Sequence, residues 1–134
     1  MESLSSSPNP TQKRILIIED DYANRMFFTD YLRFCEYGVR ALTDGLHWQQ
    51  HMKDFQPHVL LLDLDLPKIT GFELIQQIRA DSTWQTLPIV VVSGYAFNAD
   101  IQRAYALGIQ AYLIKPVRLR ELAQTIAQVA VSGG

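Results

Sequence analysis

The chain has 134 residues, close to the commonest size of a single domain, and 48% of them are hydrophobic. Charged residues make up 19%, and the formal net charge is −2, so wholesale disorder and direct nucleic-acid binding through a basic block are both excluded. The single Cys35 excludes an intrachain disulfide, and no apolar run is long enough for a signal sequence or membrane span. We therefore expect one domain in a reducing cytoplasm, without membrane attachment.

The two ends of the chain differ from its middle in composition. Residues 1–12 are rich in Ser, Pro and Asn with almost nothing apolar, which predicts a disordered tail. The domain is predicted over residues 13–131. Residues 132–134 form its C-terminal end, without the start of a linker or a second domain.

The first predicted strand is the unbroken apolar run of residues 15–18, which leads directly into Glu19 and Asp20. A run without alternation is typical of a strand that is buried on both faces of a parallel sheet. The helix predicted after it spans residues 24–35, with Asp20 or Asp21 as its N-cap. Its apolar residues lie close to a helical repeat and indicate an amphipathic helix: Met26, Phe27, Tyr31, Leu32 and Phe34.

Gly38 is the predicted stop of this helix, and residues 39–42 form a short second strand. A turn at residues 44–45 precedes the second helix, over residues 46–55. The spacing of its large apolar residues predicts that three of them are core: Trp48, Met52 and Phe55.

His47 and His51 share one face of this helix at a spacing that could hold a metal ion. No third ligand follows at a recognisable spacing, so a solvated face is the better interpretation.

Residues 59–62 form a third apolar run, and it ends in Asp63. Ligands bind at the carboxyl ends of the strands in open α/β sheets, so a carboxylate delivered there by a rigid strand is a candidate functional group. Pro67 ends this segment, and residues 71–80 repeat apolar positions as an amphipathic helix.

The last two predicted strands also end in polar residues. Residues 89–92 lead into Ser93, and residues 111–114 lead into Lys115. An amphipathic helix is predicted after each of these strands, over residues 98–107 and 118–131.

Five strands in strict alternation with five helices predict an α/β fold, a doubly wound (βα)5 domain with a five-stranded parallel sheet. The carboxyl ends of parallel strands lie at one edge of the sheet, so the residues that end these strands should converge there. The predicted cluster consists of Glu19, Asp20, Asp63, Ser93 and Lys115.

Three carboxylates at one edge repel one another by roughly 4 kcal/mol per pair at ~4 Å and an effective dielectric constant of about 20. Lys115 offsets part of this charge, and a hard divalent cation, Mg²⁺ or Mn²⁺, would offset the rest. A carboxylate nucleophile, Asp63, beside such a cation, a lysine and the Ser93 hydroxyl suits formation of an aspartyl phosphate. No glycine-rich nucleotide loop occurs in the sequence, so we expect a phosphoryl donor other than a bound nucleotide.

Over about residues 14–131 the chain resembles the receiver domain of two-component response regulators. The resemblance is carried by an acidic pair, by the pattern D-x-x-x-P-x-x-x-G, by a serine and by a Lys-Pro pair, which here are Glu19 and Asp20; Asp63, Pro67 and Gly71; Ser93; and Lys115 and Pro116. It implies the strand order 2-1-3-4-5 and makes Asp63 the phosphoacceptor. It also implies a metal site formed by Glu19, Asp20, Asp63 and the backbone carbonyl of Asp65, with Glu19 acting mostly through water.

The resemblance implies a signalling switch and not an enzyme, although the domain would assist its own phosphorylation and dephosphorylation. Asp63 would take the phosphoryl group from a phosphohistidine on a sensor histidine kinase or a histidine phosphotransfer protein. Ser93 and Tyr112 would be the switch residues. The surface over residues 98–131 would then bind a downstream protein partner, and a phosphorylation-dependent homodimer is one possible outcome.

Asp65 and Tyr95 occupy positions that should tune the lifetime of the phosphorylated state. The ring of Tyr95 over the site would hinder the attacking water, whereas Asp65 would repel or orient that water. Trp48 replaces a residue that is usually small in this family, and Val117 replaces a residue that is often aromatic.

Two alternatives stay open. Asp63 and Asp65 also resemble the D-x-D pair of haloacid dehalogenase-type phosphatases, but here the other acids come first and no acidic pair follows Lys115. The second alternative is a pseudo-receiver, a protein-binding module that keeps the fold and never takes phosphate.

Overall fold

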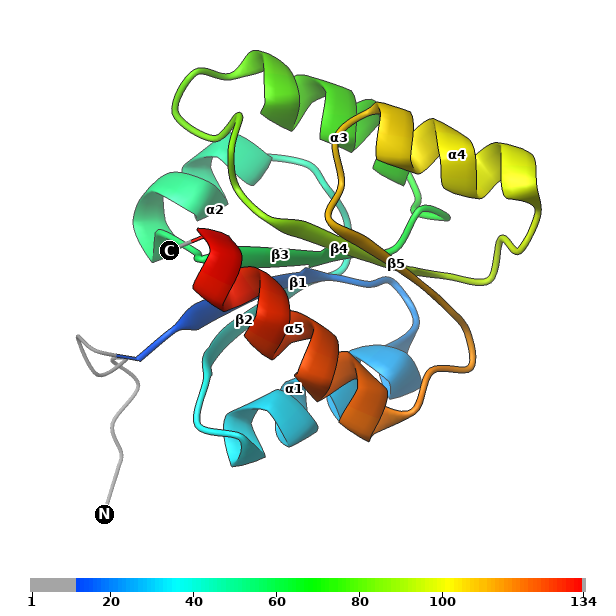
Figure 1. Ribbon diagram of the computed structural model, residues 1–134. Helices are drawn as coiled ribbons and strands as arrows, with labels where there is room; N and C mark the ends of the chain where they lie inside the picture. The colour runs from blue at the N-terminus through cyan, green and yellow to red at the C-terminus, as the bar shows by residue number, and fades with distance from the viewer. Residues whose placement is uncertain (1–11, 134) are drawn as a thin grey trace.

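The computed structural model describes residues 12–133 (Figure 1), so almost all of the predicted tail, and the last residue of the chain, lie outside the described residues. Strands and helices alternate along the chain as predicted. The elements are β1 (Arg14–Ile18), α1 (Tyr22–Phe34), β2 (Gly38–Leu42), α2 (Trp48–Phe55), β3 (Val59–Leu62), α3 (Gly71–Ala80), β4 (Ile89–Ser93), α4 (Asn98–Ala106), β5 (Ala111–Ile114) and α5 (Leu119–Gly133).

The five strands form one parallel sheet in the order β2-β1-β3-β4-β5, as expected. Backbone hydrogen bonds continue one residue past the strands: the N–H groups of Glu19, Asp63 and Lys115 donate to Leu42, Ile18 and Ser93 at 3.0, 3.1 and 2.8 Å. The residues that carry the candidate chemistry are therefore held by the sheet itself and lie level with one another.

Helices cover both faces of the sheet, with α1 and α5 on one side and α3 and α4 on the other (Figure 1). The apolar runs alternate between the two sides: Leu16 and Ile18 pack in one core cluster, whereas Ile15 and Ile17 pack in the other. Burial on both faces explains why these strands have no polar alternation. Among the described residues, no helix is both long and apolar enough to cross a membrane.

The buried face of α1 differs from the one that the apolar repeat indicated. Phe28 and Leu32 pack against the sheet, whereas Met26, Phe27 and Phe34 are 39%, 61% and 82% exposed. Two different faces of this helix carry apolar residues at helical spacing. Docking on the sheet buries the face with Phe28 and Leu32, which packs against β1 and α5. The helix consequently carries apolar side chains on its outer surface.

The end of α1 also lies elsewhere than predicted. The helix stops at Phe34 with Cys35 as its C-cap, and Glu36 takes the left-handed conformation at φ 71°. Gly38 is already the first residue of β2, where its N–H donates to the carbonyl of Lys13 at 2.9 Å. The prediction that Gly38 stops the helix is therefore wrong, because a non-glycine residue makes the reversal two positions earlier.

Helix α2 begins two residues later than predicted. The carboxylate of Asp44 accepts from the N–H of Leu46 at 2.8 Å, and exposed His47 is the N-cap at φ 59°. Trp48 is buried, and its indole N–H donates to the side chain of Gln77 on α3 at 2.8 Å, which holds the two helices together. His47 is therefore the cap that precedes the helix, and among the described residues no metal-ligand group includes His47 and His51.

At the other end of the chain α5 runs to Gly133, so it continues past the predicted end at residue 131.

Candidate functional site

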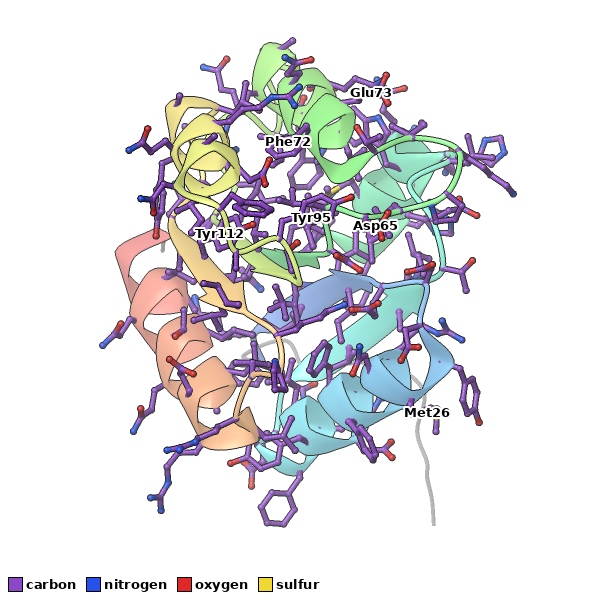
Figure 2. All side chains as sticks on the ribbon, turned by 90° about the vertical axis from the view of Figure 1, so that its right-hand side faces the viewer. Met26, Asp65, Phe72, Glu73, Tyr95 and Tyr112 are labelled. Carbon is purple, nitrogen blue, oxygen red and sulfur yellow. The ribbon has the colours of Figure 1, made fainter. Side chains whose placement is uncertain are left out.

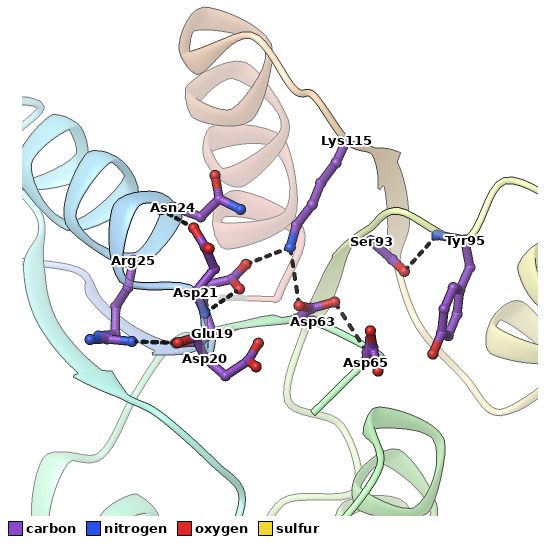
Figure 3. Close-up of polar contacts among 10 residues, drawn as sticks. All are labelled: Glu19, Asp20, Asp21, Asn24, Arg25, Asp63, Asp65, Ser93, Tyr95 and Lys115. Atoms are coloured by element: carbon purple, nitrogen blue, oxygen red, sulfur yellow. Dashed lines mark hydrogen bonds and ion pairs between the residues drawn. The ribbon is translucent and has the colours of Figure 1, made fainter. Parts of the chain in front are cut away.

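The acidic cluster lies at the carboxyl edge of the sheet (Figure 3). Glu19 follows β1 and Asp63 follows β3, and these residues are 2% and 4% exposed, whereas Asp20 is exposed. Glu19, Asp20 and Asp63 each offer a carboxylate oxygen within 4.8 Å of the others. No other group of three or more possible metal ligands occurs among the residues that the structure describes.

Lys115 is the cation of this cluster. Its Nζ lies 2.9 Å from Oε1 of Glu19 and 3.0 Å from Oδ2 of Asp63. Burial alone lowers the pKa of Lys115, but the hydrogen bonds to Glu19 and Asp63 overcome this and raise it, so the ammonium form is kept. Burial raises the pKa of Glu19, and the hydrogen bond from Lys115 opposes this effect only in part.

The orientation of Asp63 is determined on several sides. Its Oδ1 accepts from the backbone N–H of Asp65 at 3.2 Å, while Oδ2 faces Lys115. Behind it, Gly71 packs so closely that an added Cβ would lie 2.5 Å from Cα of Leu64 and 2.6 Å from the carbonyl oxygen of Asp63. The glycine at this position therefore lets α3 begin directly against the turn that carries Asp63.

The turn between β1 and α1 is fixed by its own hydrogen bonds. Oε2 of Glu19 accepts from the N–H of Asp21 at 3.1 Å, and Oδ2 of Asp21 accepts from the N–H of Asn24 at 2.9 Å. Asp21 is therefore the N-cap of α1, as one of the two predicted candidates. Arg25, which no sequence pattern singles out, donates to the carbonyl oxygens of Glu19 and Asp20.

Ser93 and two tyrosines meet at the other side of Asp63. Ser93 is fully buried, and its Oγ accepts from the N–H of Tyr95 at 3.0 Å, while the hydroxyl of Tyr112 donates to the carbonyl of Tyr95 at 2.6 Å. Figure 2 shows Tyr95 between Tyr112 and Asp65. Burial, and next the facing carboxylate of Asp65, raises the pKa of the Tyr95 hydroxyl.

The donors at this edge suit a hard divalent cation. Mg²⁺ prefers carboxylate and carbonyl oxygens together with water, and the cluster offers three carboxylates, of which Asp20 is open to solvent. A phosphoryl group beside the cation would meet Lys115 and the end of β4 that carries Ser93 (Figure 3). The arrangement can therefore neutralise and orient a phosphoryl group next to a carboxylate nucleophile.

Comparison with known protein families agrees with this geometry. The family model that describes the response regulator receiver domain matches residues 15–127, from the first strand into the last helix. This chain belongs to the response regulator receiver domain family. The resemblance stated from the sequence is confirmed, and so is the expected strand order.

Similar receiver domains occur in proteins of different length. The polar-differentiation response regulator DivK of Brucella anthropi is 26% identical over 114 residues, which cover 85% of this chain and 93% of DivK. The two-component response regulator-like protein APRR9 of Arabidopsis thaliana is 33% identical over 114 residues, 84% of this chain. This receiver domain spans 24% of the length of APRR9.

Solved structures share the whole fold of this receiver domain. A CheY-like response regulator receiver domain protein from Methanospirillum hungatei has a TM-score of 0.84 at 26% identity, over 92% of this chain and 97% of that one. The receiver domain of the sensor histidine kinase PA1611 from Pseudomonas aeruginosa has a TM-score of 0.81 at 25% identity, over 90% and 99% of the two chains. That structure has a magnesium ion coordinated in the active-site cleft.

Proposed function

We propose that this receiver domain is a phosphorylation-dependent signalling switch, in which Asp63 accepts a phosphoryl group from a phosphohistidine of a sensor histidine kinase or a histidine phosphotransfer protein. The observation that carries the proposal is the setting of Asp63: a buried carboxylate at the end of the central strand, 3.0 Å from the ammonium of Lys115 and beside two further acids.

In the reaction, a carboxylate oxygen of Asp63 attacks the phosphorus atom, the P–N bond to the donor imidazole breaks, and the imidazole leaves with the bonding electron pair. Lys115 already contacts Oδ2 of Asp63, and its ammonium group is placed to stabilise the negative charge that develops on the phosphoryl oxygens. Mg²⁺ or Mn²⁺, held by Glu19, Asp20, Asp63 and the carbonyl of Asp65, would neutralise phosphoryl oxygens when bound. The chain thus assists its own phosphorylation without turning over a separate substrate, and we do not class it as an enzyme.

The donor must place its histidine directly in front of Asp63. A groove of about 630 Å³ opens beside Lys115, and it is lined by Asn24, Phe27, Phe28, Lys115, Pro116, Val117 and Leu119. The ring of Phe27 is 61% exposed there. An apolar surface next to the acceptor suits contact with a protein donor. The single cysteine supports the expected cytoplasmic setting for this exchange.

Phosphorylation would compete with an existing hydrogen bond. Oγ of Ser93 accepts from the N–H of Tyr95, and the Ser93 side chain would have to turn toward a phosphoryl oxygen to donate to it, which would move Oγ away from that N–H and release the loop before α4. The hydroxyl of Tyr112 is bonded to the carbonyl of the same residue and would move with it. Shifting a population from 1:99 to 99:1 takes about 5.5 kcal/mol, so the charged contact of Lys115 must contribute as well.

The changed surface would be the one formed over residues 98–131, which includes α4, β5 and α5. Phe97, Tyr105 and Ile114 are exposed at or beside this surface, at 78%, 47% and 44%. A downstream protein partner or a second phosphorylated copy would bind there.

The test is the intact mass of the protein after incubation with Mg²⁺ and a small acyl-phosphate donor. We expect one phosphoryl adduct, which is lost in Asp63→Asn and in excess chelator. An adduct on the Asp63→Asn protein would mean that another residue is the acceptor. A protein that stays unmodified with every donor would be a pseudo-receiver, and steady turnover of small phosphoesters would instead favour the phosphatase.

A further inference from the structure

Arg25 connects the first turn of α1 to the acidic residues that precede the helix. Its Nη1 donates to the carbonyl oxygen of Glu19 at 3.0 Å and to that of Asp20 at 3.1 Å (Figure 3). The guanidinium carbon also lies 5.6 Å from the ring centroid of Tyr22. One half-buried side chain therefore holds two successive carbonyl groups of the turn that carries the metal-site acids.

The position of this arginine is unusual on electrostatic grounds. A cation near the N-terminus of a helix opposes the helix dipole, and α1 has no acidic residue in its first turn to offset it. Its basic counterpart, Arg33, lies in the last turn, where the dipole favours a positive charge. The two carbonyl groups and the ring of Tyr22 are the contacts that hold Arg25 where it lies.

We propose that Arg25 is a positioning residue of the metal site, which sets the affinity for a divalent cation by holding the backbone of Glu19 and Asp20. The proposal rests on the magnesium site of the proposed function. Glu19 is otherwise fixed, because its N–H is bonded to Leu42 and its carboxylate to Asp21 and Lys115.

Asp20 depends most on this contact. Its side chain is exposed, and the direction in which the carboxylate points is set by the backbone on either side of its Cα. The carbonyls of residues 19 and 20 belong to the peptide groups that flank this Cα, and Arg25 holds both. Without the guanidinium both carbonyl groups lose this partner, and the turn is held by the remaining bonds of its N–H groups. Asp20 then has more conformational freedom, which must be lost each time a cation binds.

A positioning role and a purely electrostatic role of Arg25 predict opposite changes in Mg²⁺ affinity when its guanidinium is removed. A guanidinium bonded to the backbone carbonyls of Glu19 and Asp20 repels a divalent cation bound by their carboxylates, so its removal should tighten binding if charge were its main effect. If positioning dominates, its removal should weaken binding. Loss of an outer contact that orients a metal ligand typically lowers affinity by about 10- to 100-fold.

The experiment is calorimetric titration of Mg²⁺ into the unphosphorylated protein, its Arg25→Met variant and its Arg25→Lys variant. We expect affinity about tenfold weaker in Arg25→Met and an intermediate loss in Arg25→Lys, whose ammonium can reach one carbonyl. Arg33→Met is the matched control, because Arg33 lies on the same helix and donates to one carbonyl, that of Val39, at 3.2 Å. Its Mg²⁺ affinity should equal that of the unchanged protein.

Amide exchange of Asp20 and Asp21 in metal-free protein provides a second readout, which should be faster in Arg25→Met while the core strands stay protected. Unchanged or tighter binding in Arg25→Met overturns the positioning role. If Arg25→Met does not fold, the Arg25→Lys titration decides in the same way. Failure of the unchanged protein to bind Mg²⁺ would overturn the metal site itself, and with it this inference.

Discussion

Replacing Lys115 by methionine should expose the cost of burying two carboxylates side by side. The ammonium lies 2.9 and 3.0 Å from Glu19 and Asp63, which are nearly fully buried, and 21% of the lysine side chain is exposed. Methionine keeps most of the stem and removes the charge.

The expected loss can be estimated from these distances. At an effective dielectric constant of about 20, each contact contributes roughly 5 to 6 kcal/mol of attraction, much of it cancelled by the desolvation of the ammonium. What remains in the variant is repulsion of about 3 to 4 kcal/mol between carboxylates less than 5 Å apart. Because Lys115 is partly exposed, we expect a net loss of about 2 to 4 kcal/mol in the free energy of unfolding, near the range for breaking a buried ion pair.

Urea denaturation at pH 7 in excess chelator measures this loss. Burial already raises the pKa of Glu19, so its carboxylate costs stability once the pH rises above the folded-state pKa. Loss of the ammonium should raise that pKa further, and the deficit of Lys115→Met should therefore shrink as the pH falls toward 5. Saturating Mg²⁺ should also reduce the stability deficit of Lys115→Met, because the bound cation offsets the repulsion between the carboxylates.

Lys68→Met is the control for this experiment, because the ion pair of Lys68 with Asp44 is longer, at 3.5 Å, and its side chain is 58% exposed. We expect it to change stability by less than about 1 kcal/mol. A deficit in Lys115→Met that is the same at pH 5 and pH 7, and with or without Mg²⁺, would refute the electrostatic account.

Three further predictions concern other parts of the molecule. In Tyr95→Ala, removal of the ring beside the acceptor should admit water, so the phosphoryl adduct should decay several-fold faster by mass spectrometry once the donor is removed; equal or slower decay would show that Tyr95 does not shield the site. Gly71→Ala should cost about 2 to 3 kcal/mol in urea denaturation, because its Cβ would lie 2.5 Å from the Cα of Leu64; a loss under about 1 kcal/mol would contradict this. Burial, and next Arg14, lowers the pKa of His58, whose Nδ1 accepts from the N–H of Arg14 at 2.9 Å. As the pH falls, the unfolded chain therefore binds a proton at His58 before the folded chain does. The stability that neutral His58 contributes is complete above the ordinary pKa of 6.5 and decreases below it. Between pH 7.5 and pH 5.5 the free energy of unfolding, measured by urea denaturation, should therefore fall less in His58→Gln than in the unchanged protein.

The sequence by itself determined the strands and the polar residues at their carboxyl ends. Four residues at 15–18 and four at 59–62 are apolar without interruption, which is typical of strands buried on both faces of a sheet, and Glu19 and Asp63 come directly after them. Parallel strands place their carboxyl ends at one edge, so the acidic cluster could be predicted before any coordinate was known. These features are local in the sequence, or are dictated by topology alone.

Tertiary structure decided which side chains of each helix are buried. Along α1, Phe27 and Phe34 are seven residues apart and fit a helical repeat as well as Phe28 and Leu32 do, and only the docking of the helix on the sheet left the first pair exposed. The left-handed conformation of Glu36 has no sequence signal of its own, because a glycine lies two residues further on and would serve the same purpose.

Tertiary structure also decided the contacts around the site. The hydrogen bond from Tyr112 to the carbonyl of Tyr95 joins residues 17 positions apart, and the bonds from Arg25 end on backbone atoms whose identity no side chain encodes. Sequence patterns register side-chain type and spacing, whereas these contacts depend on where a carbonyl group points after the chain has folded. The chemistry of the acceptor is therefore encoded locally, whereas the orientation of the groups that control it arises from the packing of α1 and α4 on the sheet and from the pairing of β5 with β4.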